Sequence, residues 1–269
     1  MTDTTDPLVL RQDTAGVAIL TLSRPRSINA LSEAMMAALQ AELDALAKEP
    51  AIRAVILRGA GDHFCAGHNL KEMTAARDDG ADGGFAYFQS LFATCSRMMQ
   101  SIVELPQPVI AEVSGIATAA GCQLVASCDL AVASEEARFA TSGVNIGLFC
   151  STPMVALTRN VARKHAMEML LLGDFIPASR AAEIGLINQV VPLAELSDAT
   201  LEMARKIAAK SPVPVKIGKA AFYAQAQMPL AEAYEYAGRV MAENMMARDT
   251  EAGISAFLSK SHMPEWTGE

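Results

Sequence analysis

Two stretches rich in small residues could present backbone N–H groups to a bound carbonyl oxygen. Residues 117–121 (A-T-A-A-G) follow a β-branched run and precede an apolar helical pattern. Because the first N–H groups of a helix lack intrahelical partners, the N–H of Ala120 could donate to an oxygen that carries partial negative charge. Residues 64–70 (F-C-A-G-H-N-L) could aim the N–H of His68 at the same place. Together the two stretches predict an oxyanion site built from backbone.

Other common catalytic and binding motifs are incomplete in this sequence. Gly59 and Gly61 would begin a dinucleotide-binding fingerprint, but Phe64 occupies the third glycine position. Neither a phosphate-binding P-loop nor a G-x-S-x-G turn occurs. The four histidines lack the H-E-x-x-H and H-x-x-x-H spacings of helical metal sites, and the five cysteines form no C-x-x-C pair. We therefore predict no metal site and no dinucleotide site.

Strand and helix patterns alternate along the first half of the chain, and this alternation must position the two loops. Strands are expected at residues 8–11, 17–22, 54–57 and 109–113. Helices are expected from about Ser32, which serves as N-cap, to Lys48 and over residues 85–105. Such alternation predicts an α/β fold with parallel strands and right-handed crossovers.

The second half of the chain is predicted to be mainly helical. Helices are expected over residues 152–172 and 179–183, and everything from Ala194 onward has a helical pattern. We predict a core of residues 1–200 and a helical C-terminal region of residues 201–269. Residues 78–84 (D-D-G-A-D-G-G) are expected to be mobile.

Composition bounds the class of protein. Of the 269 residues, 51% are hydrophobic and 19% charged, which is typical of a globular protein with a large core. A formal net charge of −8 argues against nucleic acid as a partner, because phosphate neutralisation needs a basic face. No apolar run is long enough for a membrane span. The acidic, polar N-terminus is unlike a signal or transit peptide, so we expect a cytoplasmic protein.

Several stretches in register resemble the crotonase family, also called the enoyl-CoA hydratase/isomerase superfamily. Residues 64–70, 108–124 and 128–133 are similar to its F-x-A-G-x-D-L loop, its P-V-I-A-x-V-x-G-x-A-x-G-G-G-x-x-L segment and its C-D-x-x-x-A strand. Asn69 replaces the aspartate of the first pattern, and Ala119 and Ala120 replace glycines of the second. Residues 22–31 and 251–260 resemble its first CoA-contacting loop and its C-terminal helix. The resemblance implies an α/β, crotonase-like spiral of ββα turns with a helical C-terminal trimerisation region.

The resemblance also implies a ligand and its contacts. The ligand would be an acyl-CoA thioester, bound as substrate rather than as a cofactor, with the N–H groups of His68 and Ala120 as its oxyanion donors. Residues at the family's CoA-contacting positions are Arg26, Lys71, Phe257 and Lys260. The last two would reach the ligand of a neighbouring subunit in a homotrimer or a hexamer made of two trimers.

Two departures from the family pattern bear on the reaction. Gln123 and Gly143 occupy the positions where hydratases of the family have the glutamates that deliver water. No Asp or Glu occurs between Val113 and Cys128 or between Ala137 and Met167. The overall resemblance implies an enoyl-CoA hydratase that adds water to a 2-trans-enoyl-CoA. The alternatives are a catalytically degenerate acyl-CoA-binding protein and a different crotonase reaction such as thioester hydrolysis or decarboxylation.

Overall fold

The structure is a computed structural model that describes residues 6–79 and 82–269. Its main sheet has the strand order β1-β2-β3-β4-β6-β9, in which β1 is antiparallel to β2 and the other strands are parallel. These strands are β1 (Val9–Thr14), β2 (Val17–Leu22), β3 (Ala54–Gly59), β4 (Val109–Val113), β6 (Leu130–Ser134) and β9 (Gln189–Val191). A smaller sheet contains β5 (Ile116–Thr118), β7 (Arg138–Ala140) and β8 (Ile176–Pro177).

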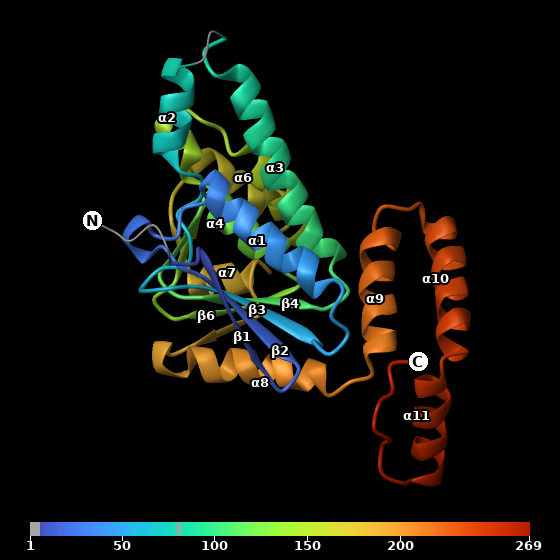
Figure 1. Cartoon of the computed structure of the whole chain (residues 1–269). Helices are drawn as coiled ribbons and strands as arrows, with labels where there is room; N and C mark the ends of the chain where they lie inside the picture. Colours follow the sequence, from blue (N-terminus) through green and yellow to red (C-terminus); the bar gives the residue numbers. More distant parts are fainter. Residues whose placement is uncertain (1–5, 80–81) are drawn as a thin grey trace.

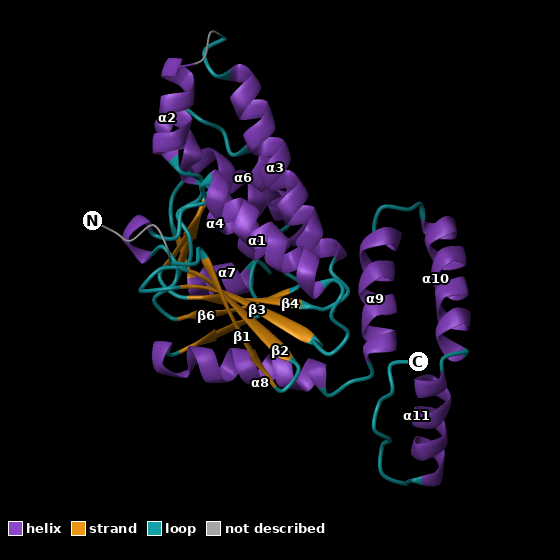
Figure 2. Ribbon diagram, in the orientation of Figure 1, coloured by secondary structure: helices purple, strands orange, loops and turns teal. Residues whose placement is uncertain are grey.

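Helices cover both faces of the main sheet (Figure 2). The α-helices are α1 (Glu33–Leu46), α2 (Leu70–Asp79), α3 (Phe85–Glu104), α4 (Ala120–Ser127), α5 (Ser151–Asn160), α6 (Arg163–Leu172), α7 (Ala178–Glu183), α8 (Leu196–Ala208), α9 (Pro212–Gln225), α10 (Leu230–Met245) and α11 (Arg248–Ser259). Short 3-10 helices are η1 (Pro25–Ser27), η2 (Ser142–Ile146) and η3 (Leu193–Glu195). Among residues 6–79 and 82–269, no helix has both the length and the apolar character needed to cross a membrane.

Alternating side chains of the parallel strands enter two separate cores. Leu20 and Leu57 point into the larger core under α1, α3 and α4, whereas Ile56 and Ile110 point into a smaller core under α8. Successive residues of a strand face opposite sides, so a strand covered on both faces is apolar throughout. This burial explains why residues 54–57 of β3 and 109–111 of β4 are all apolar.

Most predicted elements are present, with shifted ends. The predicted N-cap is confirmed, because the Ser32 side chain accepts a hydrogen bond from the Met35 N–H at 3.0 Å. The single helix predicted over residues 152–172 is wrong. The chain leaves α5 at Val161 and stays extended to Ala162 before α6 begins, which buries the Val161 side chain. The centre of the segment predicted to be mobile, residues 80–81, lies outside the described residues.

The C-terminal helices α9, α10 and α11 stand beside the rest of the molecule (Figure 1). A polar cluster joins α9 to the core. Lys219 of α9 lies 2.6 Å from Asp129 and also donates to two backbone carbonyls of the core, and Tyr223 donates to the other oxygen of Asp129 at 2.9 Å. The predicted domain boundary at residue 200 falls within α8, and the division into two domains stays a prediction.

Candidate active site

A strained turn between β5 and α4 precedes the first N–H of α4. Ala119 has φ +51° and ψ −118°, a conformation that residues other than glycine rarely adopt. Ala120, the first residue of α4, does not have positive φ, so alanine is accommodated there without backbone strain. Its N–H has no intrahelical acceptor, as is usual for the first turn of a helix.

The loop that carries His68 is fixed on both sides by backbone hydrogen bonds. Thr118 of β5 donates to the carbonyl of Cys65 at 3.0 Å. On the other side Leu31 donates to the carbonyl of Gly67 at 2.8 Å, and Asn69 donates to the carbonyl of Leu31 at 3.3 Å. These two hydrogen bonds form a parallel β-bridge between Leu31 and His68, in which the carbonyl of Gly67 and the N–H of Asn69 face Leu31. The N–H of His68 therefore points away from Leu31.

Glycines let the two backbone segments touch. A Cβ atom on Gly67 would lie 3.0 Å from the backbone nitrogen of Ala120, and one on Gly121 would overlap the carbonyl oxygen of Cys65. No backbone acceptor among the described residues takes the N–H of His68 or of Ala120. The structure therefore places the two predicted donors on segments in direct contact. Their role in binding an oxygen stays a prediction.

The imidazole of His68 is a neutral, largely buried group. Its ring packs edge-on against Phe92 of α3, with 5.5 Å between ring centroids. Burial lowers the pKa of His68 from 6.5 to about 4, because the charged form would lose its hydration. The Nε2 atom is buried, and no residue that the structure describes hydrogen-bonds to it. At neutral pH this imidazole carries no charge.

Gln123 and Gly143 lie beside this turn in different ways. Gln123 is one turn into α4, where its N–H donates to the carbonyl of Ala119. Its buried Oε1 has no hydrogen-bond partner in the described part of the chain. Gly143 lies in η2 and does not have positive φ. A Cβ atom at Gly143 would overlap the carbonyl oxygen of Leu148 and lie 2.8 Å from the sulfur of Cys150. Packing, rather than backbone conformation, therefore excludes a side chain at position 143.

No buried carboxylate lies at this turn among the described residues. The buried carboxylates are Glu112, which bonds to Ser197, and Asp249, which bonds to Ser211 in the C-terminal region. The nearby thiol of Cys122 is protonated at neutral pH, because burial raises its pKa to about 12. Besides the two backbone N–H donors, the neutral imidazole and the amide of Gln123, the turn carries the hydroxyls of Thr118 and Ser142, which lie 2.9 Å apart.

The four predicted CoA contacts separate into two pairs. Arg26 in η1 and Lys71 in α2 are exposed. Lys71 follows the His68 loop directly in sequence, and η1 lies next to this loop because Ala66 donates to the carbonyl of Ile28, just after η1. Phe257 and Lys260 belong to α11 and its C-cap, and α11 lies at the far end of the molecule from α2 (Figure 1). A single chain therefore does not bring the four residues together, and their contacts to CoA stay predictions.

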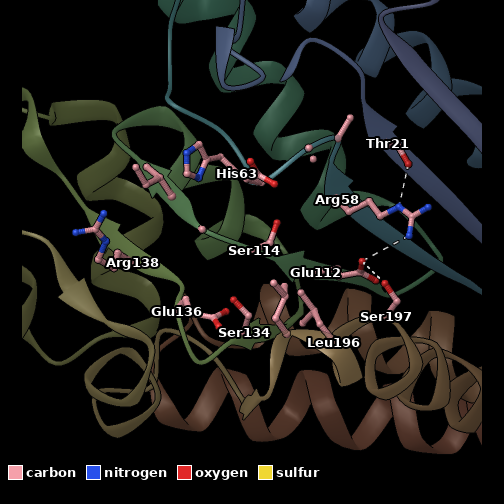
Figure 3. Close-up of a pocket in the computed structure, with 17 residues that line it drawn as sticks. Thr21, Arg58, His63, Glu112, Ser114, Ser134, Glu136, Arg138, Leu196 and Ser197 are labelled. Atoms are coloured by element: carbon pink, nitrogen blue, oxygen red, sulfur yellow. Dashed lines mark hydrogen bonds and ion pairs between the residues drawn. The ribbon is translucent and has the colours of Figure 1, made fainter. Parts of the chain in front are cut away.

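A large crevice elsewhere on the molecule was not predicted from the sequence. It has a volume of about 770 Å³ and lies where β2, β3, β4 and β6 end, and it contains none of the predicted site residues (Figure 3). One signal could have indicated it: Thr21, Arg58 and Glu112 are polar residues at the ends of otherwise apolar strands. Polar groups at the carboxyl ends of parallel strands commonly line ligand sites.

Near full-length relatives are known. The chain is 47% identical over 254 residues to the human mitochondrial enoyl-CoA hydratase domain-containing protein 3, covering 94% of this chain and 82% of that protein. The protein of that name from Xenopus laevis is 46% identical, covering 97% of this chain and 86% of that one. A crystal structure of an enoyl-CoA hydratase from Mycobacterium smegmatis has 52% identity and a TM-score of 0.92, covering 97% of this chain and 99% of that chain.

The expectation of a cytoplasmic protein is contradicted by these relatives, since the human, frog and zebrafish proteins are named as mitochondrial. The expectation used the polarity of the first residues. Location depends on a targeting address that receptors read, and neither composition nor fold determines it.

The comparison of structures and the comparison of sequences with family models identify the same family. The human enoyl-CoA hydratase domain-containing protein 3 has also been solved, and its structure matches with 45% identity and a TM-score of 0.91 over 96% of this chain and all of that one. A sequence model of the family described as enoyl-CoA hydratase/isomerase matches residues 12–269. The mixed main sheet, the smaller second sheet and the C-terminal helices are those of crotonase structures. The chain is thus a member of the crotonase, or enoyl-CoA hydratase/isomerase, family.

Proposed function

We propose that the protein binds an acyl-CoA thioester and polarises its carbonyl with the N–H groups of His68 and Ala120. The observation that carries this proposal is the contact between the two loops at Gly67 and Gly121, together with the lack of a backbone acceptor for either N–H among the described residues. Fixed N–H donors stabilise charge that develops on a thioester oxygen, and each contributes roughly 10²–10³ in rate.

Hydration of a 2-trans-enoyl-CoA would be slow at this site. Adding water across the double bond requires a group that accepts a proton from water and a group that gives one to the α-carbon. The amide of Gln123 does neither at neutral pH, and position 143 has no room for a side chain. Losing one acid–base group costs roughly 10²–10⁴ in rate. We therefore expect binding with little hydration.

Decarboxylation of a 2-carboxyacyl-CoA is the second candidate, and one observation favours it. No buried carboxylate lies at the turn among the described residues, so a carboxylate on the substrate would meet no buried negative charge there; the half-buried Glu72 accepts a hydrogen bond from Asn69. In this reaction the bond from the α-carbon to the carboxylate breaks, and CO₂ leaves. The electron pair enters an enolate whose oxygen accepts from His68 and Ala120, and the α-carbon then takes a proton from water. The protein needs no base for this step.

The assembly that we propose is a homotrimer, alone or paired into a hexamer. Large apolar side chains are exposed on the C-terminal helices, namely Leu230 (75%), Tyr234 (74%), Met241 (68%), Phe257 (72%) and Leu258 (74%). Exposed apolar area of this extent is typical of a surface that contacts another chain. In such an assembly Phe257 and Lys260 would lie beside a neighbour's Arg26 and Lys71. A strictly monomeric species in light scattering at micromolar concentration would contradict this.

The carbonyl stretch of bound butyryl-CoA tests the thioester proposal. With ¹³C at the carbonyl, infrared difference spectra report the hydrogen bonds that the oxygen accepts. We expect a shift to lower frequency than in water, and we expect His68→Ala to keep it because alanine retains the backbone N–H. Gly67→Ala should reduce it, since the added Cβ lies 3.0 Å from the Ala120 nitrogen. If the carbonyl stretch of bound butyryl-CoA has the same frequency as that of butyryl-CoA in water, the proposal is contradicted.

Turnover assays separate the reactions. We expect no or very slow hydration of crotonyl-CoA, measured by loss of its conjugated absorbance, and Gln123→Glu should raise the rate. Release of CO₂ from a 2-carboxyacyl-CoA would support decarboxylation. Tight binding without turnover of any ester would support the degenerate alternative. Robust hydration by the unmodified protein would show that another group transfers the protons.

A further inference from the structure

One carboxylate connects the loop that carries His68 to a helix from an earlier part of the chain. Glu72 lies in the first turn of α2, directly after this loop, and both of its oxygens accept hydrogen bonds. Oε1 accepts from the side-chain amide of Asn69 at 3.0 Å, and Oε2 accepts from the backbone N–H of Glu33 at 3.0 Å. Glu33 is the first residue of α1, so its N–H has no acceptor within that helix. Glu72 therefore joins the start of α2 to the start of α1.

Asn69, the residue just before α2, makes two hydrogen bonds with its side chain. Its carbonyl oxygen accepts from the N–H of Lys71 at 3.1 Å, which is the usual bond of an N-cap residue. Its amide nitrogen donates to Glu72. The aspartate of the family pattern could make the first bond but not the second, because a carboxylate has no hydrogen to donate. Asparagine at this position thus adds a contact to the cap. We call this pair the Asn69–Glu72 clamp.

The Asn69–Glu72 clamp lies beside the parallel bridge between Leu31 and His68. On one side of the bridge the chain continues from Leu31 into α1, and on the other side it continues from His68 into α2. Glu72 joins the first turns of these two helices, so the same two segments are held together at two points, the bridge and the carboxylate. Two points of attachment restrict rotation of the loop about either one. The direction of the His68 N–H therefore depends on both.

The negative charge of Glu72 lies where two helices favour it. The N-terminal ends of α1 and α2 carry partial positive charge, and Glu72 contacts the first residue of α1 from the first turn of α2. Hydrogen bonds to a charged acceptor are stronger than those between neutral groups. Among residues 6–79 and 82–269, no Lys, Arg or His forms an ion pair with Glu72. Its oxygens thus act on the two helix ends rather than on a cation.

We propose that Asn69 and Glu72 are positioning residues of the oxyanion site, which hold the N–H of His68 in the direction of the thioester oxygen. This inference rests on the proposed function, because it concerns the alignment of one of the two donors named there. The pair acts through the backbone of the loop and not by contact with the ligand. A donor that is already aligned stabilises developing charge without having to reorient. Loss of the pair should therefore weaken the hydrogen bond to the thioester oxygen while the fold is kept.

Hydrogen–deuterium exchange resolved to single amides, on the full-length protein without ligand, tests whether the clamp holds the loop. The N–H groups of Leu31 and Asn69 form the bridge, whereas the N–H of Thr118 holds the other side of the loop. In Glu72→Ala we expect exchange at Leu31 and Asn69 to be about tenfold faster, because the loop opens locally more often. Exchange at Thr118 should keep its rate.

Three matched variants separate the clamp from other effects. Asn69→Ser keeps an oxygen that can cap α2 but is too short to reach Glu72, so exchange at Leu31 should rise by a smaller factor. Glu33→Gln changes an exposed carboxylate and keeps the backbone N–H that contacts Glu72, so exchange should not change. Asn69→Asp combined with Glu72→Gln interchanges the donor and the acceptor of the pair and should restore the original rates.

The carbonyl stretch of bound ¹³C-labelled butyryl-CoA tests the positioning role. Glu72→Ala should lose roughly half of the downward shift that the unmodified protein produces, because one of its two donors is no longer aligned. A purely structural role of Glu72 would lower the melting temperature and leave the frequency in the folded complex unchanged. Glu33→Gln and the double variant at positions 69 and 72 should keep the full shift.

Each outcome has its own meaning. Unchanged exchange at Leu31 and Asn69 in Glu72→Ala, or equal effects of Glu72→Ala and Glu33→Gln, would overturn the clamp. Faster exchange in Glu72→Ala with the full carbonyl shift retained would overturn its positioning role. If the unmodified protein produces no shift, the proposed function and the positioning role fail together, whereas faster exchange in Glu72→Ala would still support the clamp.

Discussion

The core and the C-terminal helices of this protein differ in how far they bury their apolar side chains. In the core, α4 is buried along its whole length, and glycine packing brings its first turn into contact with the His68 loop. In α9 and α10 no residue is buried, and large apolar side chains are exposed. The apolar residues of the core are thus buried by other parts of the same chain. The apolar side chains of the C-terminal helices are not covered by any other described part of the chain.

The polar cluster around Lys219 connects these two regions, and breaking it should have the largest effect. Lys219→Met removes the ammonium group that contacts Asp129 and two core carbonyls. Leaving a largely buried carboxylate without its cation should lower the free energy of unfolding by about 3–5 kcal/mol. Tyr223→Phe removes one hydrogen bond and should cost about 1 kcal/mol. Urea denaturation followed by circular dichroism measures both.

The control for this cluster lies on the same helix. Lys216 of α9 is exposed, so Lys216→Met should change stability by no more than about 0.5 kcal/mol. Equal effects at 216 and 219 would show that the cluster does not attach the C-terminal helices.

A pair of glycine substitutions contrasts the two regions directly. Gly121→Ala places a Cβ atom onto the carbonyl oxygen of Cys65, so the two oxyanion loops must separate. We expect a loss of about 1–3 kcal/mol in the free energy of unfolding, together with weaker binding of butyryl-CoA. Gly218→Ala in α9 meets nothing within 4 Å and should stabilise by about 0.5–1 kcal/mol. If Gly121→Ala leaves both stability and binding intact, the loops are not held by this contact.

The buried imidazole of the core should make stability depend on pH. Burial lowers the pKa of His68 from 6.5 to about 4, so between these values the unfolded state binds a proton that the folded state does not. Stability therefore rises with pH through this window, by on the order of 2–3 kcal/mol, and is lost again as the pH falls from 6.5 toward 4.

Denaturation of the protein and of His68→Gln at several pH values checks this, and the variant should show a smaller slope. NMR titration of the imidazole gives its pKa directly. An imidazole that titrates near 6.5 would show that the ring is hydrated and the core is open at this point.

Changing the exposed apolar surface should affect assembly and leave the core almost unchanged. Leu258→Glu in α11 should convert the proposed trimer to monomers, because a charge replaces a side chain that is 74% exposed in the single chain. The free energy of unfolding of the core should change by less than about 0.5 kcal/mol. Light scattering gives the mass, and Glu232→Gln on α10 is a polar control that should keep it. An unchanged mass for Leu258→Glu would contradict an interface at α11.

Particular residues show where prediction from sequence succeeded. The Ser32 cap and the strands of the main sheet follow from local patterns that need no tertiary partner. The break at Val161 was not predictable, because an apolar residue between two helical patterns does not interrupt either pattern. The crevice at the ends of β2, β3, β4 and β6 was missed because Thr21, Arg58 and Glu112 lie far apart in sequence and meet only through strand register.

The sequence by itself determined the alternation of strands and helices, the small residues of the two loops, and the absence of Asp and Glu around positions 123 and 143. Each of these is a property of residue type and near neighbours along the chain. Only the tertiary structure decided that Gly121 lies against Cys65, that Gly143 has no room for a side chain, and that His68 is neutral. These properties depend on atoms from segments that are distant in sequence. Where such segments pack together, they fill the space that a side chain would need and they remove water from the buried groups.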